Sequence, residues 1–473
     1  EKSYAANGYE SEIEPAEGDI TDGVQFVTVT NTMNVGDLSV TKTVTGTGAE
    51  TEREFEFTLT LTNEAGVTVD NTYTTSEGTL TVENGEATFT LKDGETLTIY
   101  GIPEGTAYTV TETVPAADGY AMTATGESGD IVAEKTAEAK FENHRDVGSL
   151  TITKEVEGNG EDAPNALTEF EVTVTLTAPE GVTLKGEWTQ GEESGAAEAT
   201  NTFILEDGES VEFTGLPEGT KYAVTEKSYA ANGYESEIEP AEGDITDGAQ
   251  SVTVTNTMNV GDLSVSKTVN GSGAQARREF TFTLTLENAD GVTVDNTYTT
   301  SEGTLTVENG EATFTLTGGE TLTIYGIPEG TAYTVAEADP TGYGYIITAT
   351  SGEEGTIGTG TSQAAFTNTR DVGELTIEKT VEGAIGETDK AFAFTLELTP
   401  SGNGVGVDGT YDATLYTADT AQGTIVAVAN GVAGFTLTHD QRLVIHELPA
   451  GATYEVTEAS YALDGYQTEA SGE

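Results

Sequence analysis

The stretch GDLSVTKTV at residues 36–44 alternates polar and apolar side chains over its whole length. A two-residue period of this kind is typical of a β-strand that buries one face. Leu38, Val40 and Val44 share one face of the predicted strand, and Lys42 lies on that same face. The segment therefore predicts a half-buried strand that directs one lysine toward the core.

This stretch recurs three more times along the chain, at spacings of 112 or 113 residues. The copies are GSLTITKEV at 148–156, GDLSVSKTV at 261–269 and GELTIEKTV at 373–381. Two other segments repeat letter for letter at about twice this spacing. Residues 1–23 recur at 226–248, and residues 71–91 recur at 296–316. Internal repeats of this kind indicate a tandem array of similar modules.

The spacing predicts three complete modules and two partial ones. The complete modules are residues 36–147, 148–260 and 261–372; residues 1–35 are the C-terminal part of a truncated module, and residues 373–473 form a module without its last strand. The simplest interpretation is that the sequence covers one part of a longer array. An alternative hypothesis is a head-to-tail filament, in which the strand of a neighbouring chain completes the last module.

Each module contains further alternating runs, rich in Thr, Val, Phe and Tyr and separated by turns with glycine. FEFTLTL at 55–61 is one such run, and GIPEG at 101–105 is a Pro-Gly turn between two of them. About 112 residues with many short strands are typical of an all-β, immunoglobulin-like β-sandwich. Junctions such as NTMNVGDL at 31–38 lack Gly/Ser tracts, so we expect stiff connections between modules.

Composition excludes several classes of function. The chain has 82 Asp and Glu residues against 18 Lys and Arg, a formal net charge of −64. Such a surface repels nucleic acid and anionic membranes, so no nucleic-acid partner is expected. No stretch is long and apolar enough for a membrane helix, and the absence of cysteine leaves no disulfide to stabilise a secreted protein.

Three polar side chains in each module lie in phase with its core residues. They are a lysine on the first strand, a glutamate after the Pro-Gly turn and an asparagine on the last strand. The lysines are Lys42, Lys154, Lys267 and Lys379, the glutamates are Glu112, Glu226, Glu337 and Glu458, and the asparagines are Asn31, Asn143, Asn256 and Asn368. An unpaired buried charge costs on the order of several kcal/mol, so the lysine and glutamate of a module should meet.

Two interpretations of this trio remain open on the sequence pattern. One is a buried Lys–Glu ion pair capped by the asparagine amide. The other is covalent: burial favours a neutral, nucleophilic lysine amine, which attacks the asparagine side-chain carbonyl while the glutamate moves protons. Neither arrangement is a site for turnover, because the covalent reaction consumes its own groups, so no enzyme is predicted.

The run LPEGTKYAVTE at 216–226 resembles the signature of CnaB-type repeats, the B-region modules of collagen adhesins that are also found in Gram-positive pilins. The resemblance implies a self-formed Lys–Asn isopeptide bond with glutamate as catalyst. It maps onto Lys42–Asn143 with Glu112, Lys154–Asn256 with Glu226, and Lys267–Asn368 with Glu337. Lys379 and Glu458 match in the last module, and Glu1 and Asn31 match in the truncated first one. The last module departs from the pattern, with ELPAG at 447–451 and a longer preceding insert.

The function predicted from these observations is the structural stalk of an extracellular adhesin or pilus-like fibre, attached to a bacterial cell wall or cell surface. Its expected partners are neighbouring modules of the same chain, with a host or cell-surface ligand bound by a tip outside this region. No cofactor and no metal ion is expected. An alternative hypothesis is an adhesin whose repeated modules each bind a ligand.

Overall fold

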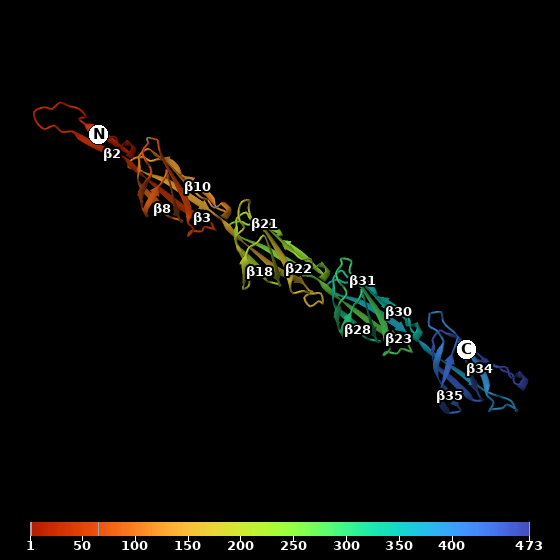
Figure 1. Cartoon of the computed structure of the whole chain (residues 1–473). Helices are drawn as coiled ribbons and strands as arrows, with labels where there is room; N and C mark the ends of the chain where they lie inside the picture. The colour runs from red at the N-terminus through yellow and green to blue at the C-terminus, as the bar shows by residue number, and fades with distance from the viewer. Residues whose placement is uncertain (1, 65, 115, 473) are drawn as a thin grey trace. The chain divides into compact units, whose positions relative to one another are not determined.

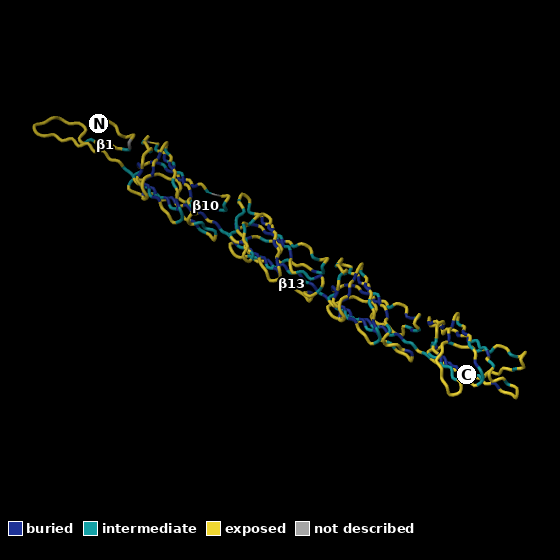
Figure 2. The backbone as a smooth tube through the Cα atoms, turned by 60° about the horizontal axis from the view of Figure 1, so that its bottom comes forward, coloured by how far each residue is buried: buried dark blue, intermediate teal, exposed yellow. Residues whose placement is uncertain are grey.

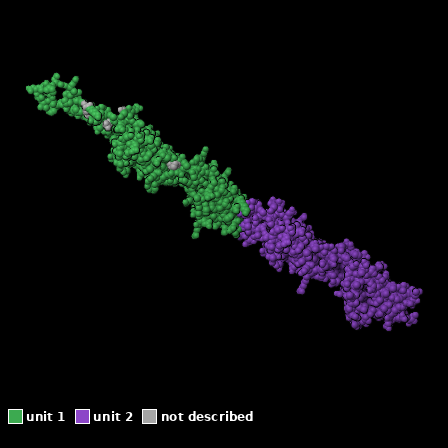
Figure 3. All heavy atoms as spheres, viewed as in Figure 1, with its two compact units in different colours: residues 1–156, 168–227, 236–255 green, residues 157–167, 228–235, 256–473 purple. Residues whose placement is uncertain are grey.

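The computed structural model describes residues 2–64, 66–114 and 116–472, and strands make up most of it (Figure 1). The chain divides into two compact units, residues 1–156, 168–227 and 236–255 in one and residues 157–167, 228–235 and 256–473 in the other (Figure 3). Helical structure in the described ranges is confined to short 3-10 turns. None of these turns has the length and apolar character needed to cross a membrane.

The first module forms two sheets, one of six strands and one of four. The six-stranded sheet has the order β10-β12-β3-β8-β5-β6, and the four-stranded sheet has the order β11-β9-β4-β7. Their bounds are β3 Val35–Thr45, β4 Phe55–Asn63, β5 Asn71–Thr75, β6 Gly78–Val82, β7 Glu86–Leu91, β8 Thr96–Pro103, β9 Thr106–Glu112, β10 Ala121–Thr125, β11 Ser128–Asp130 and β12 Thr136–His144, with a 3-10 turn η2 at Ala116–Asp118.

One hydrophobic core lies between these two sheets. Leu38 and Val40 of β3 reach it from the larger sheet, and Phe57 and Leu59 of β4 reach it from the smaller one. Buried residues alternate with partly buried or exposed ones along β3 and β4, and Figure 2 colours the backbone by burial. The all-β, repeated fold predicted from the sequence pattern is confirmed.

The first and last strands of the module lie side by side. β3 pairs with β12 in parallel, with Phe141 opposite Lys42 and Asn143 opposite Val44. On its other side β3 pairs antiparallel with β8. The strand that carries the lysine is therefore central in the sheet, and its neighbour carries the asparagine.

The second and third modules repeat this arrangement. Their six-stranded sheets are β16-β15-β18-β13-β22-β20 and β26-β25-β28-β23-β32-β30, and their four-stranded sheets are β17-β14-β19-β21 and β27-β24-β29-β31. In the second module the elements are β13 Val147–Gly158, β14 Phe170–Thr177, β15 Glu187–Gln190, β16 Glu193–Ala196, β17 Thr200–Leu205, β18 Ser210–Pro217, β19 Lys221–Glu226, η3 Ala230–Asn232, β20 Tyr234–Glu239, β21 Glu242–Asp244 and β22 Ala249–Met258. In the third they are β23 Val260–Asn270, β24 Phe280–Glu287, β25 Thr297–Thr300, β26 Gly303–Thr306, β27 Glu311–Leu316, β28 Thr321–Pro328, β29 Ala332–Glu337, η4 Thr341–Tyr343, β30 Ile346–Ser351, β31 Glu354–Thr356 and β32 Thr361–Thr369.

The two end regions form smaller sheets. At the N-terminal end, η1 (Ala5–Asn7) precedes a hairpin of β1 (Tyr9–Glu14) and β2 (Thr28–Met33). The last region has the sheets β33-β38-β35-β36 and β37-β34-β39. Its elements are β33 Val372–Lys379, β34 Phe392–Thr399, β35 Gly409–Thr417, β36 Thr420–Val428, β37 Val432–Leu437, β38 Gln441–Pro449, β39 Thr453–Glu458 and η5 Ala462–Asp464. β33 thus lies at a sheet edge, whereas its counterpart β3 is central.

A recurring backbone hydrogen bond joins a 3-10 turn to the following module. Thr68 N donates to Ala6 O at 3.0 Å, Thr183 N donates to Ala117 O at 2.7 Å, and Thr293 N donates to Ala231 O at 2.8 Å. Each acceptor lies in one of the turns η1, η2 and η3. The same backbone contact thus occurs after each of these three turns.

Charged side chains add to the junction after the first module. The Asp118 carboxylate accepts hydrogen bonds from Arg53 of its own module at 2.7 Å and from Lys185 of the next module at 2.6 Å. The hydrogen bond from Lys185, with that from Arg53, lowers the pKa of Asp118 against the effect of its partial burial. The carboxylate therefore stays ionised and holds both cations.

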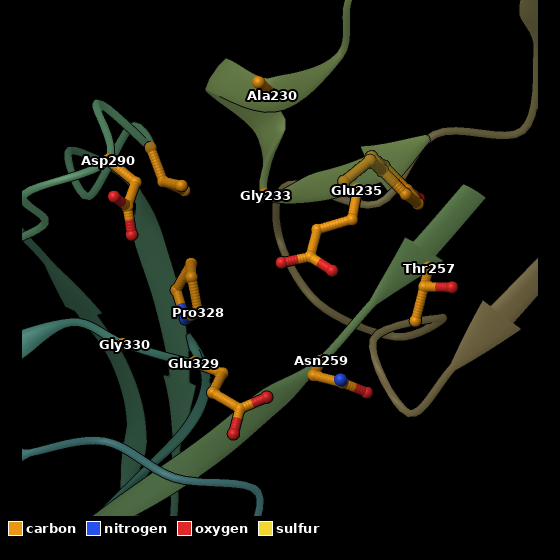
Figure 4. Close-up of a pocket in the computed structure, with 11 residues that line it drawn as sticks. Ala230, Gly233, Glu235, Thr257, Asn259, Asp290, Pro328, Glu329 and Gly330 are labelled. Atoms are coloured by element: carbon orange, nitrogen blue, oxygen red, sulfur yellow. The ribbon is translucent and has the colours of Figure 1, made fainter. Parts of the chain in front are cut away.

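A shallow pocket lies at the corresponding junction next to η3, between Ala230, Gly233 and the turn that contains Pro328 (Figure 4). Glu235, Asp290 and Glu329 are among its lining residues. Within the described ranges, however, no group of three or more Asp, Glu or His side chains is placed to hold a metal ion.

Candidate cross-linking site

In the first module the predicted trio meets in the core. Lys42 of β3 and Asn143 of β12 come from the six-stranded sheet, and Glu112 of β9 comes from the facing sheet. The Lys42 Nζ atom lies 3.0 Å from Glu112 Oε1 and donates to Oε2 at 3.2 Å. Asn143 Nδ2 donates to Glu112 Oε1 at 2.5 Å. The glutamate therefore contacts both the amine and the amide.

The third module reproduces this geometry. Lys267 Nζ lies 2.8 Å from Glu337 Oε1 and 2.9 Å from Oε2, and Asn368 Nδ2 donates to Glu337 Oε1 at 2.5 Å. The lysine and glutamate side chains are fully buried in both modules. The Oδ1 atoms of Asn143 and Asn368 are buried without a hydrogen-bond partner. A buried amide oxygen without a hydrogen-bond partner lowers the stability of the fold. It is also the oxygen on which negative charge would develop if an amine attacked the carbonyl.

A phenylalanine ring forms an apolar wall beside each lysine, a feature that the sequence analysis did not identify. The Nζ atoms of Lys42, Lys154, Lys267 and Lys379 lie 4.6, 4.5, 4.5 and 4.3 Å from the ring centroids of Phe55, Phe170, Phe280 and Phe392. The available signal was the first aromatic residue of the recurring run FEFTLTL and its copies. These rings exclude water from the amine while their faces attract its charged form.

Burial lowers the pKa of the lysines in the three complete modules. For Lys42, Lys154 and Lys267 desolvation is the largest cause, and the nearby glutamate opposes it. Because the neutral amine is the nucleophile, the lowered pKa increases the fraction of each lysine that can react at a given pH. The electrostatics thus favour nucleophilic chemistry at these three lysines.

The second module differs in detail. Lys154 Nζ lies 3.8 Å from Glu226 Oε1 and donates hydrogen bonds to the backbone carbonyls of Glu155 at 2.7 Å and Val254 at 3.1 Å. Glu226 Oε2 also accepts a hydrogen bond from Ser236 Oγ at 2.7 Å. Asn256 is fully buried, as are its counterparts in the first and third modules.

The end regions hold parts of the trio. In the last module Lys379 Nζ lies 2.7 Å from Glu458 Oε1, and its side chain is 15% exposed. Thr468 Oγ1 donates to Glu458 Oε2 at 2.8 Å. Asn31 lies on the exposed strand β2, where its Oδ1 accepts a hydrogen bond from Ser11. The predicted residue Glu1 lies outside the described residues.

The amine, the carboxylate and the amide are therefore brought together in the first and third modules without any substrate. Holding the reacting groups within one rigid core replaces a slow bimolecular step by an intramolecular one. The arrangement is suited to a single acyl transfer from the asparagine amide to the lysine amine.

One domain family covers almost the whole array. A family model described as "Domain of unknown function (DUF7601)" matches residues 36–145, 148–258, 261–370 and 373–473.

Among curated proteins, the chain is similar to two from Streptococcus pyogenes. It is 43% identical over 81 residues to a "Pilus tip adhesin Cpa", a match over 17% of this chain and 12% of that protein. It is 29% identical over 141 residues to a "Pilin" of serotype M1, which covers 27% of this chain and 41% of that protein. The chain thus matches less than half the length of either relative.

Solved structures with similar parts include the major pilin from Streptococcus pyogenes, at 18% identity and a TM-score of 0.27. That match covers 48% of this chain and 99% of the pilin. A pilus-presented adhesin, Cpa, matches at 15% identity with a TM-score of 0.25, over 71% of this chain and 100% of the adhesin.

Proposed function

This chain belongs to the DUF7601 domain family, which it contains in four tandem copies. We propose that it is part of the structural stalk of a bacterial surface pilus or adhesin. Its modules are of the CnaB type, with the boundaries predicted from the repeats, and each of the three complete modules is locked by a Lys–Asn isopeptide bond. The observation that carries the proposal is the buried Lys–Glu–Asn cluster, which recurs with the same contacts in the first and third modules.

The reaction proposed for the first module balances within the cluster. Glu112 takes a proton from the Lys42 ammonium, and the neutral Nζ attacks Cγ of Asn143. The Nζ–Cγ bond forms and the Cγ–Nδ2 bond breaks, while Glu112 passes this proton, and then the second proton that Nζ loses, to Nδ2, which leaves as an ammonium ion. The glutamate ends as it began, and the lysine and asparagine are consumed. The module is therefore no enzyme, because the reaction can take place only once.

The position of the bond suits a stalk under tension. A pulling force enters a module through β3 and leaves it through β12, and these strands are parallel neighbours. A covalent link from Lys42 to Asn143 carries the force directly between them. The roughly 100 residues between the two positions then remain folded, and the stalk keeps its length.

The relatives support a place on the bacterial surface. Parts of the chain are similar to a pilin and to a pilus tip adhesin, and both names describe proteins of a surface fibre. A stalk in such a fibre lies outside the cell and is attached to the cell wall or cell surface. Its ligand would be bound by a separate tip, and its immediate partners are its own neighbouring modules.

Single-molecule pulling on the full chain tests the stalk function. We expect the three modules with a complete trio to stay folded, and an Asn143→Ala variant to add one unfolding step. Without the bond, about 100 more residues become extensible, which corresponds to roughly 350 Å of added contour length. An Asn201→Ala variant, which removes a buried asparagine far from any site lysine along the chain, serves as the control and should add no such step. Full extension of all modules in the unmodified chain would contradict the proposal.

A second candidate function is assembly of chains into a filament by strand exchange. The free edge of β33 corresponds to the position that β12 occupies beside β3. The strand β2 could pair with this edge of β33 and bury an apolar side chain there. Its residue Val29 is 50% exposed, whereas Val254, the corresponding residue of the second module, is 0% exposed. In this arrangement Asn31 of one chain would meet Lys379 and Glu458 of the next.

Denaturing gel electrophoresis of the concentrated chain tests this assembly. The expected result is a ladder of covalent multimers that disappears in Lys379→Ala and in Asn31→Ala variants. A Lys390→Ala variant is the matched control, since Lys390 is also near the C-terminal end but pairs with Asp464. A single band at every concentration would exclude strand exchange between chains and leave the stalk proposal intact.

A further inference from the structure

The position two residues after a recurring tyrosine differs between modules. In the first and third modules it holds Met122 and Ile347, which follow Tyr120 and Tyr345. In the second and last modules it holds Ser236 and Thr468, which follow Tyr234 and Tyr466. The array thus contains two forms of the same position, one apolar and one with a hydroxyl group.

The hydroxyl groups at this position contact the site glutamates. Ser236 Oγ donates to Glu226 Oε2 at 2.7 Å, and Thr468 Oγ1 donates to Glu458 Oε2 at 2.8 Å. Met122 and Ile347 have no hydroxyl to donate, and they lie opposite Asn143 and Asn368 in strand register. Glu226 and Glu458 therefore each accept a hydrogen bond from a hydroxyl group that this position does not provide to Glu112 and Glu337.

A donor on the carboxylate changes the energy of the first chemical step. The glutamate must take a proton from the lysine before the amine can attack, and a hydrogen bond to the carboxylate stabilises the charged form that must be lost. In the second module Lys154 Nζ also donates hydrogen bonds to the carbonyls of Glu155 and Val254, which favour its charged form against the desolvation that lowers its pKa. Both partners of the ion pair thus have hydrogen bonds that weaken when the proton moves from Lys154 to Glu226.

On the basis of the proposed isopeptide chemistry, we propose that Ser236 is a positioning residue that slows bond formation in the second module by holding Glu226 as a carboxylate. The first and third modules, with Met122 and Ile347, cross-link faster. The array consequently completes its bonds in two stages. We expect a difference of about tenfold, the rate factor of one hydrogen bond to a charged group.

The three complete modules of one chain allow the rates to be compared in the same molecule. The full chain is synthesised in a cell-free system, samples are quenched in acidic denaturant over time, and mass spectrometry quantifies the cross-linked peptide from each module. We expect the Lys154–Asn256 peptide to form about tenfold more slowly than the other two. Ser236→Met should remove the delay, and Ser236→Thr should retain it because threonine keeps the donor.

The reciprocal variant Met122→Ser should slow bond formation in the first module alone. A folding defect in the second module could not produce this result. Equal rates in all three modules, or a delay that persists in Ser236→Met, would overturn the role of Ser236 while leaving the isopeptide bonds established. A chain in which no module loses ammonia would instead remove the proposed function and, with it, this inference. Each result thus points to one of the two proposals.

Discussion

The intact mass of the purified chain is expected to be lower than the mass of its sequence by three molecules of ammonia. Each loss reports one bond, Lys42–Asn143, Lys154–Asn256 or Lys267–Asn368. The first and third modules already place the amine, the carboxylate and the amide in contact, with the lysine and glutamate fully buried. The last module should lose no ammonia unless an asparagine from elsewhere reaches Lys379.

Glutamate variants test whether bond formation requires the glutamate. Glu112→Ala and Glu337→Ala should each regain the mass of one ammonia, because the proton carrier between amine and amide is gone. Glu138→Ala is the matched control, since Glu138 also belongs to the first module but is exposed and pairs with Lys140. Its mass deficit should remain at three ammonias. A parent chain at full sequence mass would mean that the buried lysines are only ion-paired.

The second large effect concerns stability. We expect Asn143→Ala to lower the free energy of unfolding of the first module by about 4 to 5 kcal/mol, the contribution that a cross-link closing a loop of about 100 residues makes in the chain-entropy model. The variant keeps the Lys42–Glu112 ion pair, so that it does not leave a buried charge unpaired.

Amide hydrogen exchange in β3 and β4 measures this change within the full chain, because it reports the opening of one module rather than of the array. Asn201→Ala is again the control, and the loss of its buried hydrogen bonds should cost about 1 to 3 kcal/mol in the second module only. If exchange in β3 were as fast in the parent chain as in Asn143→Ala, no cross-link would be holding the module closed.

The sequence pattern was sufficient to predict the fold class and the burial of the lysine. Alternation across GDLSVTKTV placed Lys42 on the buried face of its strand, and the structure gives it no exposure. The phase of Glu112 after the Pro-Gly turn was equally clear. These predictions succeed because the direction of a side chain in a strand depends only on its parity along the strand.

Contacts between distant strands were beyond such reasoning. Parity gives the face of a strand but not its neighbours, so the parallel pairing of β3 with β12 could not be derived from it. For the same reason, the sequence pattern could not predict the ring of Phe55 beside Lys42 or the hydrogen bond from Ser236 to Glu226. The longer 3.8 Å separation of Lys154 from Glu226 also arises from the packing of side chains that are far apart in the sequence.

The parallel pairing of β3 with β12 also sets the order of events while the chain is being made. A nascent module cannot complete its larger sheet until its final strand has been synthesised, about 100 residues after the first. During that interval the open side of β3 can accept a wrong strand of similar sequence, which is a characteristic error of repeat proteins. Segments identical letter for letter lie 225 residues apart, as residues 1–23 and 226–248 do, and the closing strands of the first two complete modules, TAEAKFENH at 136–144 and AQSVTVTNTM at 249–258, differ in sequence. The two-module period of the array thereby limits the exchange of strands between neighbours at the stage when each module is most exposed to it.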